Sequence, residues 1–320
     1  MSEDGGGEAA ALEALGAALP APSAGEVWFG DDAAVLAGEA GPLLLATDLL
    51  AEGVHFDRQW SSLADVGWKA LATNVSDMAA MGGRPRRAVV AVAGLFGRDL
   101  DELYHGLLEA ADAFSCPVVG GDLSAAASGG GIVVSIAVLG STEGRPAVLR
   151  GGARAGDRLY LTGPLGASAA GLRMLREGGE VEANCVLAHR RPVPRLAEGV
   201  IAARCGASAM IDISDGLGID LDRLARASKL GAVLESIPVA PGATSDEALG
   251  GGEDYELLIA LPRAAGIEAA FADAGLKAPI AIGVLVSDAG LRTLAGTTLP
   301  AAGYLHAGPA GAGQAPAPTR

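Results

Sequence analysis

The sequence predicts a two-domain protein of the α/β (α+β) class. Its 320 residues suit two domains of about 150 residues each. Half of the residues are apolar, which is enough to build a full core in both domains. Short β-type runs alternate with helical stretches on both sides of a Gly- and Arg-rich passage, Gly140 to Gly156, which we interpret as a domain joint.

We expect four parts along the chain. They are an N-terminal segment at 1–25, an N-terminal domain at 26–145, a C-terminal domain at 146–307 and a disordered tail at 308–320. The first segment is rich in Gly and Ala and contains a short helical stretch near Ala9–Ala18. The tail consists mainly of Gly, Ala and Pro, a composition that cannot bury enough apolar surface to order itself.

Hydrophobic spacing predicts the elements of the first half. The expected strands are Leu43–Ala46, Arg87–Ala93, Pro117–Val119 and Ile132–Leu139. A helix is expected over Asp65–Met81, because its apolar residues recur at helical spacing and Gly82-Gly83 follow it. A second helix should begin at an Asp99 N-cap, with Glu102 three residues further on.

The second half continues the same alternation. The expected strands are Arg158–Thr162, Ala209–Ile213, Ala232–Glu235, Glu256–Leu261 and Ile280–Val286. The expected helices lie after Gly166, around Val193–Cys205, over Leu217–Ser228 and from Arg263 onwards.

Charge and cysteine usage exclude several classes of function. With 38 acidic and 23 basic residues, the net charge of −15 repels nucleic acid and anionic membranes, so neither is an expected partner. Three scattered cysteines argue against a disulfide framework or a zinc site and favour a reducing, cytoplasmic location. The acidic N-terminus does not resemble a secretory signal, and the longest apolar run, Ala88 to Phe96, is too short to span a bilayer.

Five short acidic motifs, nearly all introduced by Gly, Ser or Thr, are the most informative feature of the chain. They are Gly30-Asp31-Asp32, Thr47-Asp48, Ser76-Asp77, Gly120-Gly121-Asp122 and Asp212-Ile213-Ser214-Asp215-Gly216. Oxygen ligands among small residues suit a hard cation such as Mg²⁺ rather than zinc or copper. Because Mg²⁺ usually bridges carboxylates to substrate phosphates, the motifs predict an enzyme that acts on a phosphorylated nucleotide.

Two of these motifs in the first half have alternative interpretations. Asp77 lies in an otherwise apolar helix, where a carboxylate needs a partner such as a metal or Arg unless it belongs to a solvent-facing polar stripe. Gly120-Gly121-Asp122 follows the strand Pro117–Val119. Its glycines allow a close approach of the backbone to a phosphate, and the alternative is a hairpin turn.

The second half offers two strand-to-helix turns. In the motif that begins at Asp212, the helix that follows presents an N-terminal anion site, although Asp215 can instead serve only as its N-cap. The turn Gly163–Gly166 either cradles a phosphate or is a simple turn. The segment Gly250–Glu256 places glycines beside three carboxylates, and His55 either positions a substrate or is structural.

Common nucleotide-binding motifs are missing from the sequence. No Gly-x-x-x-x-Gly-Lys-Ser/Thr loop occurs, so the chain is not a P-loop enzyme. His189-Arg190-Arg191 does not match the catalytic loop of protein kinases.

Taken in order, the motifs resemble those of the thiamine-monophosphate kinase family. The matching stretches are Gly30–Leu36, Thr47-Asp48, Glu52–Phe56, Asp65–Ala72, Asn74–Gly82, Gly120–Asp122, Arg150–Ala153, Gly156-Asp157, Thr162–Leu172, Ile211–Leu217 and Gly251–Leu257. The resemblance runs from about residue 26 to 305, and the stretches over 65–82 and 251–257 are its most specific parts.

This resemblance implies a fold, an activity and an assembly. The fold is that of aminoimidazole ribonucleotide synthetase and selenophosphate synthetase, in which the N-terminal domain binds metal and ATP and joins two copies into a homodimer. The implied reaction is the ATP-dependent phosphorylation of thiamine monophosphate to thiamine diphosphate with several Mg²⁺ ions. We expect direct in-line transfer without a phosphoenzyme.

The resemblance also implies roles for individual residues. The metal-binding positions are Asp31, Thr47, Asp48, Asp77, Asp122, Asp212 and Asp215, with Asp77, Asp122 and Asp215 acting in catalysis. The nucleotide contacts are Tyr104, Gly121, Asp122, Arg150 and Ser214, with Arg145 as an alternative to Arg150. The substrate contacts are His55, Glu253 and Tyr304. The chain departs from the family by lacking its Gly-Glu-Phe opening and by having Tyr304 where another aromatic residue is expected.

Two other functions remain alternatives. One is a different ATP-dependent enzyme of the same fold, although a selenophosphate synthetase carries a reactive Cys near its N-terminus and the first Cys here is Cys116. The other is a non-catalytic nucleotide-binding scaffold or maturation factor, which would need fewer metal-binding positions. In either case, acidic residues on both sides of the joint predict that the active site is a cleft between the domains.

Overall fold

The computed structural model describes residues 15–23, 26, 36, 38, 41–126, 130–178, 182–262 and 266–304. The predicted metal ligand Asp31 and the predicted tail at 308–320 lie outside these residues. Of the predicted helical stretch Ala9–Ala18, the described part begins at Leu15 and is helical.

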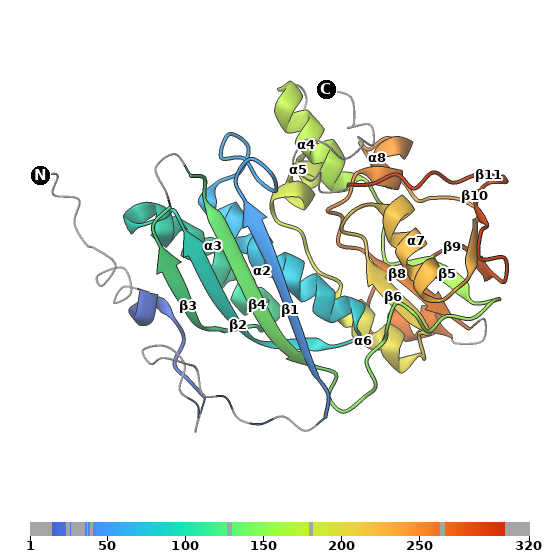
Figure 1. Cartoon of the computed structure of the whole chain (residues 1–320), viewed down its shortest axis with the longest axis horizontal. Helices are drawn as coiled ribbons and strands as arrows, with labels where there is room; N and C mark the ends of the chain where they lie inside the picture. The colour runs from blue at the N-terminus through green and yellow to red at the C-terminus, as the bar shows by residue number, and fades with distance from the viewer. Residues whose placement is uncertain are drawn as a thin grey trace, which may run out of the picture.

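The first half contains a four-stranded sheet covered on one face by two helices. The strands are β1 (Leu43–Ala51), β2 (Arg84–Ala93), β3 (Val118–Ser124) and β4 (Val133–Ser141), in the spatial order β1-β4-β2-β3. β4 pairs antiparallel with β1 and β2, and β3 pairs parallel with β2. Helices α2 (Leu63–Ala80) and α3 (Gly97–Phe114) lie behind this sheet on the left side of Figure 1.

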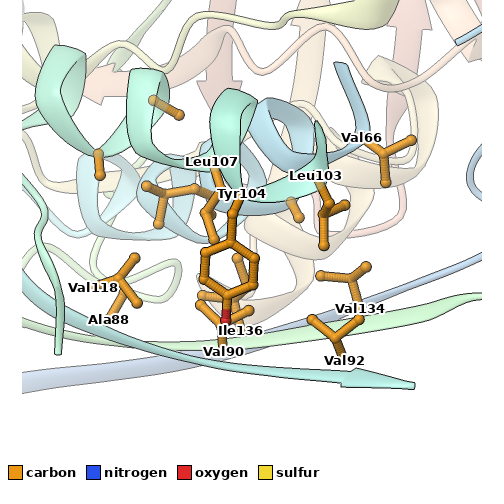
Figure 2. Close-up of a cluster of buried hydrophobic side chains, with 14 of the residues drawn as sticks. Val66, Ala88, Val90, Val92, Leu103, Tyr104, Leu107, Val118, Val134 and Ile136 are labelled. Carbon is orange, nitrogen blue, oxygen red and sulfur yellow. The ribbon is translucent and has the colours of Figure 1, made fainter. Parts of the chain in front are cut away.

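The core of this half lies between the sheet and the two helices. Inward-facing valines of β2 and β4 meet Leu103 and Leu107 of α3, and the ring of Tyr104 extends from α3 towards Val90 and Ile136 (Figure 2). The helix backbones also touch, because a Cβ atom on Gly67 would lie 2.0 Å from the carbonyl oxygen of Leu103. This contact fixes the position of α2 relative to α3.

The opposite face of the same sheet is apolar and uncovered in the single chain. Along β1, Leu44 and Leu50 are buried, whereas Leu43, Leu45 and Leu49 are exposed. Val89 of β2 is exposed on the same outer face. The outward-facing leucines of β1 are unusual for a sheet face that meets water, since such faces normally carry polar residues.

The second half contains a seven-stranded mixed sheet in the order β11-β10-β7-β9-β5-β8-β6. Its strands are β5 (Arg158–Leu161), β6 (Ala209–Asp212), β7 (Gly231–Leu234), β8 (Leu257–Leu261), β9 (Ile280–Val286), β10 (Arg292–Leu294) and β11 (Thr297–Thr298). Its helices are α4 (Ala167–Glu177), α5 (Ala183–Arg190), α6 (Leu196–Arg204), α7 (Leu217–Ala227), α8 (Ser245–Gly250) and α9 (Ile267–Asp273). Leucines of α7 pack on one face of the sheet, and α6 and α9 pack on the other.

The predicted elements are confirmed in position, with corrections at several boundaries. Asp99 is not an N-cap: α3 begins at Gly97 after Phe96, and Asp99 lies in the first turn, 3.2 Å from Arg58. Gly120-Gly121-Asp122 does not end a strand but lies inside β3. Helices α5 and α8 and the short strands β10 and β11 were not predicted.

Helix α2 belongs to both halves of the molecule. It packs on the four-stranded sheet with one side and contacts α5, α6 and β6 of the second half with another. At its N-terminal end, the indole nitrogen of Trp68 donates to the carbonyl oxygen of Pro192 over 2.8 Å. The junction of the halves in Figure 1 is therefore built around α2.

Two observations bear on the predictions made from composition. None of the helices in the described residues is both long enough and apolar enough to cross a membrane. Cys116, Cys185 and Cys205 are separate free thiols, and burial raises the pKa of Cys116 to about 12, so this thiol is inert.

Candidate active site

A stripe of polar side chains along α2 faces the second half. Lys69, Thr73, Ser76 and Asp77 follow one another at intervals of three or four residues or are adjacent, so they share one side of the helix. The Ser76 hydroxyl donates to Asp212 Oδ2 over 2.7 Å, which joins α2 directly to the end of β6. The solvent-facing interpretation of this stripe is wrong, because Lys69, Thr73 and Ser76 are buried.

Three carboxylates from different elements meet at this junction: Asp48 of β1, Asp77 of α2 and Asp212 of β6. Burial, followed by the charges of Asp212 and Asp48, raises the pKa of Asp77 to about 7, and Arg150 opposes this shift. Burial also raises the pKa of Asp48 and that of Asp212. The cluster therefore holds more negative charge than its single neighbouring arginine balances, a condition that a bound cation relieves.

The structure separates the two arginines that the sequence left as alternatives. Arg150 lies close enough to Asp77 and Asp212 to lower the pKa of both carboxyls. Arg145 instead pairs with Glu143 over 3.4 Å and lines a cavity on the joint with Arg204. Arg150 is thus the arginine that the fold brings to the acidic cluster.

The loop after β6 is held by a buried carboxylate that the sequence analysis missed. Asp220 Oδ2 accepts hydrogen bonds from the backbone nitrogens of Ser214, Asp215 and Gly216 over 3.0–3.1 Å. Gly216, not Asp215, is the N-cap of α7, and it makes no side-chain capping bond. The predicted anion site is therefore already filled by the protein's own carboxylate at these three amides, and Asp215 pairs with Arg223 over 2.5 Å.

The segment Glu253–Glu256 joins three neighbouring parts of the structure. Glu253 accepts from Lys69 of α2 over 3.1 and 3.2 Å, and its own backbone nitrogen donates to Ser214. Asp254 accepts from the backbone nitrogen of Gly166 over 2.8 Å, so the Gly163–Gly166 turn is also occupied by a carboxylate of the chain. Burial raises the pKa of Asp254 to about 7.

Glu256 forms the most buried ion pair of this segment. Arg195 Nε donates to Glu256 Oε2 over 2.9 Å, a second bond joins Arg195 Nη2 to Oε1 over 2.5 Å, and the Thr162 hydroxyl also donates to this carboxylate. Glu256 is 4% exposed, so removing its partner would leave a charge without water or cation.

We predict that Arg195→Met lowers the free energy of unfolding by about 3 kcal/mol, because breaking a buried pair leaves an uncompensated carboxylate. Urea denaturation measures this loss. The control is the double variant Arg195→Met/Glu256→Leu, which should recover most of the stability because no charge stays behind. A loss below about 1 kcal/mol in the single variant, the usual value for exposed pairs, would show that the ion pair contributes little.

Several predicted site residues are not close to the acidic cluster in the single chain. Thr47 is on the outer face of the sheet, where its hydroxyl donates to the Ile136 carbonyl over 3.0 Å. Gly121 and Asp122 lie on β3, at the opposite edge of the sheet from β1 and about 14 Å away at the usual strand spacing. Tyr104 is buried in the core between α3 and the sheet (Figure 2), and burial raises its pKa to about 12.

The remaining predicted residues lie near the cluster. His55 Nδ1 accepts from the backbone nitrogen of Ala51 over 3.0 Å, and the charge of His55 lowers the pKa of Asp48. The backbone nitrogen of Tyr304 donates to the carbonyl oxygen of Asp215 over 2.8 Å. Ser214 lies in the loop that Asp220 holds.

The donor set of the cluster fits a hard cation. No group of three or more potential ligand side chains is arranged as a preformed metal site in the part of the chain that the structure describes, which excludes Asp31. The side chains that meet here are nevertheless carboxylates, crowded and desolvated enough to raise their pKa values. Such oxygen ligands suit Mg²⁺.

Comparison with known proteins identifies the family. Two family models match the chain: "AIR synthase related protein, N-terminal domain" over residues 30–142, and the corresponding C-terminal domain over residues 154–294. Thiamine-monophosphate kinase from Mycobacterium tuberculosis is 37% identical over 268 residues, covering 79% of this chain and 80% of that protein. The Bacillus subtilis enzyme of the same name is 35% identical and covers 72% and 76% of the two chains.

A solved structure gives the same answer in three dimensions. The complex described as AaThiL complexed with AMPPCP and TMP superposes with a TM-score of 0.73 at 33% identity, covering 82% of this chain and 86% of that one. This agreement confirms the predicted two-part α/β architecture. The chain therefore belongs to the thiamine-monophosphate kinase family, within the AIR synthase related proteins.

Proposed function

We propose that this protein transfers the terminal phosphoryl group of ATP to thiamine monophosphate and so forms thiamine diphosphate. The observation that carries the proposal is the meeting of Asp48, Asp77 and Asp212 at the junction of the two halves, in a chain that belongs to this kinase family. Donor and acceptor are both phosphorylated, so their approach requires strong charge neutralisation. A cluster of crowded carboxylates provides that through cations rather than directly.

We propose that Asp48, Asp77 and Asp212 hold Mg²⁺, with Asp31, Thr47, Asp122 and Asp215 completing the set that the family resemblance implies. When bound, Mg²⁺ would neutralise phosphate oxygens and stabilise the charge that develops on the transferred group. Ser76 orients Asp212 through its 2.7 Å hydrogen bond, and Asp220 holds the loop that carries Ser214 and Asp215.

The chain's own contacts explain why cations have to do so much of this neutralisation. Helix N-termini commonly bind phosphates. Here the amides after β6 bond to Asp220 and the turn before α4 bonds to Asp254. Neither turn is left free for an anion, so Arg150 is the cationic side chain that the fold directs to this cluster.

The acceptor needs little activation. A phosphate monoester is largely ionised at neutral pH, since its second pKa is about 6. Its oxygen can therefore attack the donor phosphorus without a strong general base, and the protein's task is to align the two phosphates and screen their charges. We propose direct in-line transfer, with His55, Glu253 and Tyr304 on the side of the thiamine monophosphate.

We further propose that two copies of the chain associate through the outer face of the four-stranded sheet. Leu43, Leu45, Leu49 and Val89 are each at least 42% exposed there, an arrangement that a second copy would cover. Asp122 and Gly121 sit on the same sheet, on its edge strand β3. Covering this face by a partner would explain how residues so far from Asp77 within one chain serve the same reaction.

The direct test is turnover of the purified protein with Mg²⁺, ATP and thiamine monophosphate. We expect ADP and thiamine diphosphate in equal amounts, whereas free thiamine should be a poor acceptor because the site is arranged around an existing phosphate. Nucleotide binding without turnover of any acceptor would favour the non-catalytic alternative. Phosphorylation of thiamine but not of its monophosphate would contradict the proposal.

The cellular setting stays a prediction from the sequence. The scattered free cysteines favour a reducing compartment, and we propose that the protein works in the cytoplasm on small molecules. The net charge of −15 argues against nucleic-acid and anionic-membrane partners.

A further inference from the structure

Lys69 is a buried lysine for which the proposed reaction has no stated use. Its side chain is only 2% exposed, although ammonium groups are rarely buried unless they are paired. Its nitrogen lies 3.2 and 3.1 Å from the two oxygens of Glu253, a residue 184 positions later in the chain. The pair therefore links α2 of the first half to the Gly-rich segment of the second half.

Glu253 itself is held in an unusual conformation. Its φ of 56° lies in the left-handed region that side-chain-bearing residues rarely adopt. Its backbone nitrogen donates to Ser214 over 2.7 Å, and that of Tyr255 donates to Ile213 over 2.9 Å. The backbone is thus fixed beside the loop that follows Asp212, and the direction of the carboxylate depends on its side-chain partners.

Two side chains contact this carboxylate: Lys69 and His189. His189 Nδ1 lies 3.5 Å from Glu253 and 3.2 Å from the Ser168 hydroxyl. Burial, followed by the charges of Lys69 and nearby arginines, lowers the pKa of His189 to about 3, so its ring is neutral at physiological pH. Of these two partners, Lys69 is therefore the one that carries a positive charge.

The location of the pair excludes a direct role for Lys69 in binding phosphate. At 2% exposure, its ammonium cannot reach a ligand, whereas the Glu253 side chain is 28% exposed and remains accessible. Lys69 lies eight residues before Asp77 on α2, which is about 12 Å along the helix axis. One rigid helix thus holds both Glu253 and a member of the acidic cluster at a fixed separation.

We infer that Lys69 is a positioning residue that aims the carboxylate of Glu253 at the thiamine monophosphate, and so sets the affinity for the acceptor but not for ATP. This inference rests on the proposed function. It predicts a separation of the two substrates: loss of Lys69 leaves Glu253 free to turn away and adds an unbalanced charge to a region already rich in carboxylates. The acceptor site should suffer, and the metal and nucleotide side should not.

The test compares Lys69→Met, Glu253→Gln and the double variant with the unmodified protein. Methionine keeps the length and apolar stem of lysine and removes its charge. We expect Lys69→Met to raise the KM for thiamine monophosphate by about 10-fold or more, the usual scale for breaking a buried charge pair, while the KM for ATP stays within about twofold. Lys277→Met, which removes an exposed lysine, is the matched control and should change neither KM.

The double variant keeps the inference testable even if Lys69→Met alone folds poorly, because removing both members of a buried pair is usually tolerated. If Lys69 acts through Glu253, the double variant and Glu253→Gln should have the same KM for thiamine monophosphate. An unchanged KM in Lys69→Met, or a parallel rise in the KM for both substrates, would overturn the inference. Failure of the unmodified protein to phosphorylate thiamine monophosphate would instead overturn the proposed function.

Discussion

Asp77→Asn should lower kcat by about 1000-fold or more while making the metal-free protein more stable. The loss of activity follows because a carboxylate that holds Mg²⁺ supplies several kcal/mol of charge stabilisation. The gain in stability follows because Asp77 lies among other carboxylates: burial and the charges of Asp212 and Asp48 raise its pKa to about 7. An amide in the same place carries no charge to be desolvated or repelled.

The sign of the pH dependence can be worked out from this shift. Asp77 has a higher pKa in the folded protein than its ordinary value of 3.8. Its contribution to stability is therefore complete below about pH 4 and is lost as the pH rises through about 7. Compared with Asp77→Asn, the unmodified protein should lose about 2–4 kcal/mol between pH 5 and pH 8.

The measurement is urea unfolding of both proteins in EDTA at the two pH values, with Mg²⁺ titrated back at pH 8. Other acidic groups, such as Asp220 and Asp254, titrate in both proteins and cancel in the comparison. Mg²⁺ should stabilise the unmodified protein more than the variant, by mass action on the folded state. Normal turnover of Asp77→Asn at saturating Mg²⁺ would mean that this carboxylate is not a metal ligand.

The second large effect concerns Asp122, which the fold places at the wrong edge of the sheet for its predicted role. If a partner copy supplies this residue, Asp77→Asn and Asp122→Asn are each inactive alone but should restore activity when mixed. Refolding an equal mixture makes half of the dimers mixed, and each mixed dimer has one site with both aspartates intact. About a quarter of the normal activity should therefore return.

The outcome distinguishes two arrangements. If both aspartates of a site come from one chain, every site in a mixed dimer lacks one of them and no activity returns. Mixing Asp77→Asn with Asp212→Asn is the matched control, because Ser76 joins α2 to Asp212 within one chain and this pair should not complement. Restored activity in the control alone would contradict the assignment of residues to chains.

The sequence analysis succeeded where local pattern carries the information. Asp77 in an apolar helix required a partner, and the structure brings Asp48 and Asp212 to it. It was wrong about Gly120-Gly121 because glycines usually end strands. Here Gly121 pairs within β3, at a point where a Cβ atom would lie 2.0 Å from the carbonyl oxygen of Val90, so the close approach of two strands explains the residue.

Other features depend on contacts that spacing does not reveal. Lys69 and Glu253 are 184 residues apart, and nothing in their local sequences connects them. Asp220 is different, because it lies only four to six residues after the amides that it binds. An aspartate in the first turn of a helix that follows a polar loop is a signal that could have been used to predict this contact.

The alternation of β1 also has a consequence for how this protein can change over time. Leu43, Leu45 and Thr47 face one way, and Leu44 and Asp48 face the other. Replacing any one of them affects one face only. Inserting or deleting a single residue before Asp48 would exchange the faces, moving a carboxylate onto the apolar side and a leucine or threonine towards Asp77. We therefore expect related sequences to vary in the composition of this strand while keeping the number of residues between Leu43 and Asp48 unchanged.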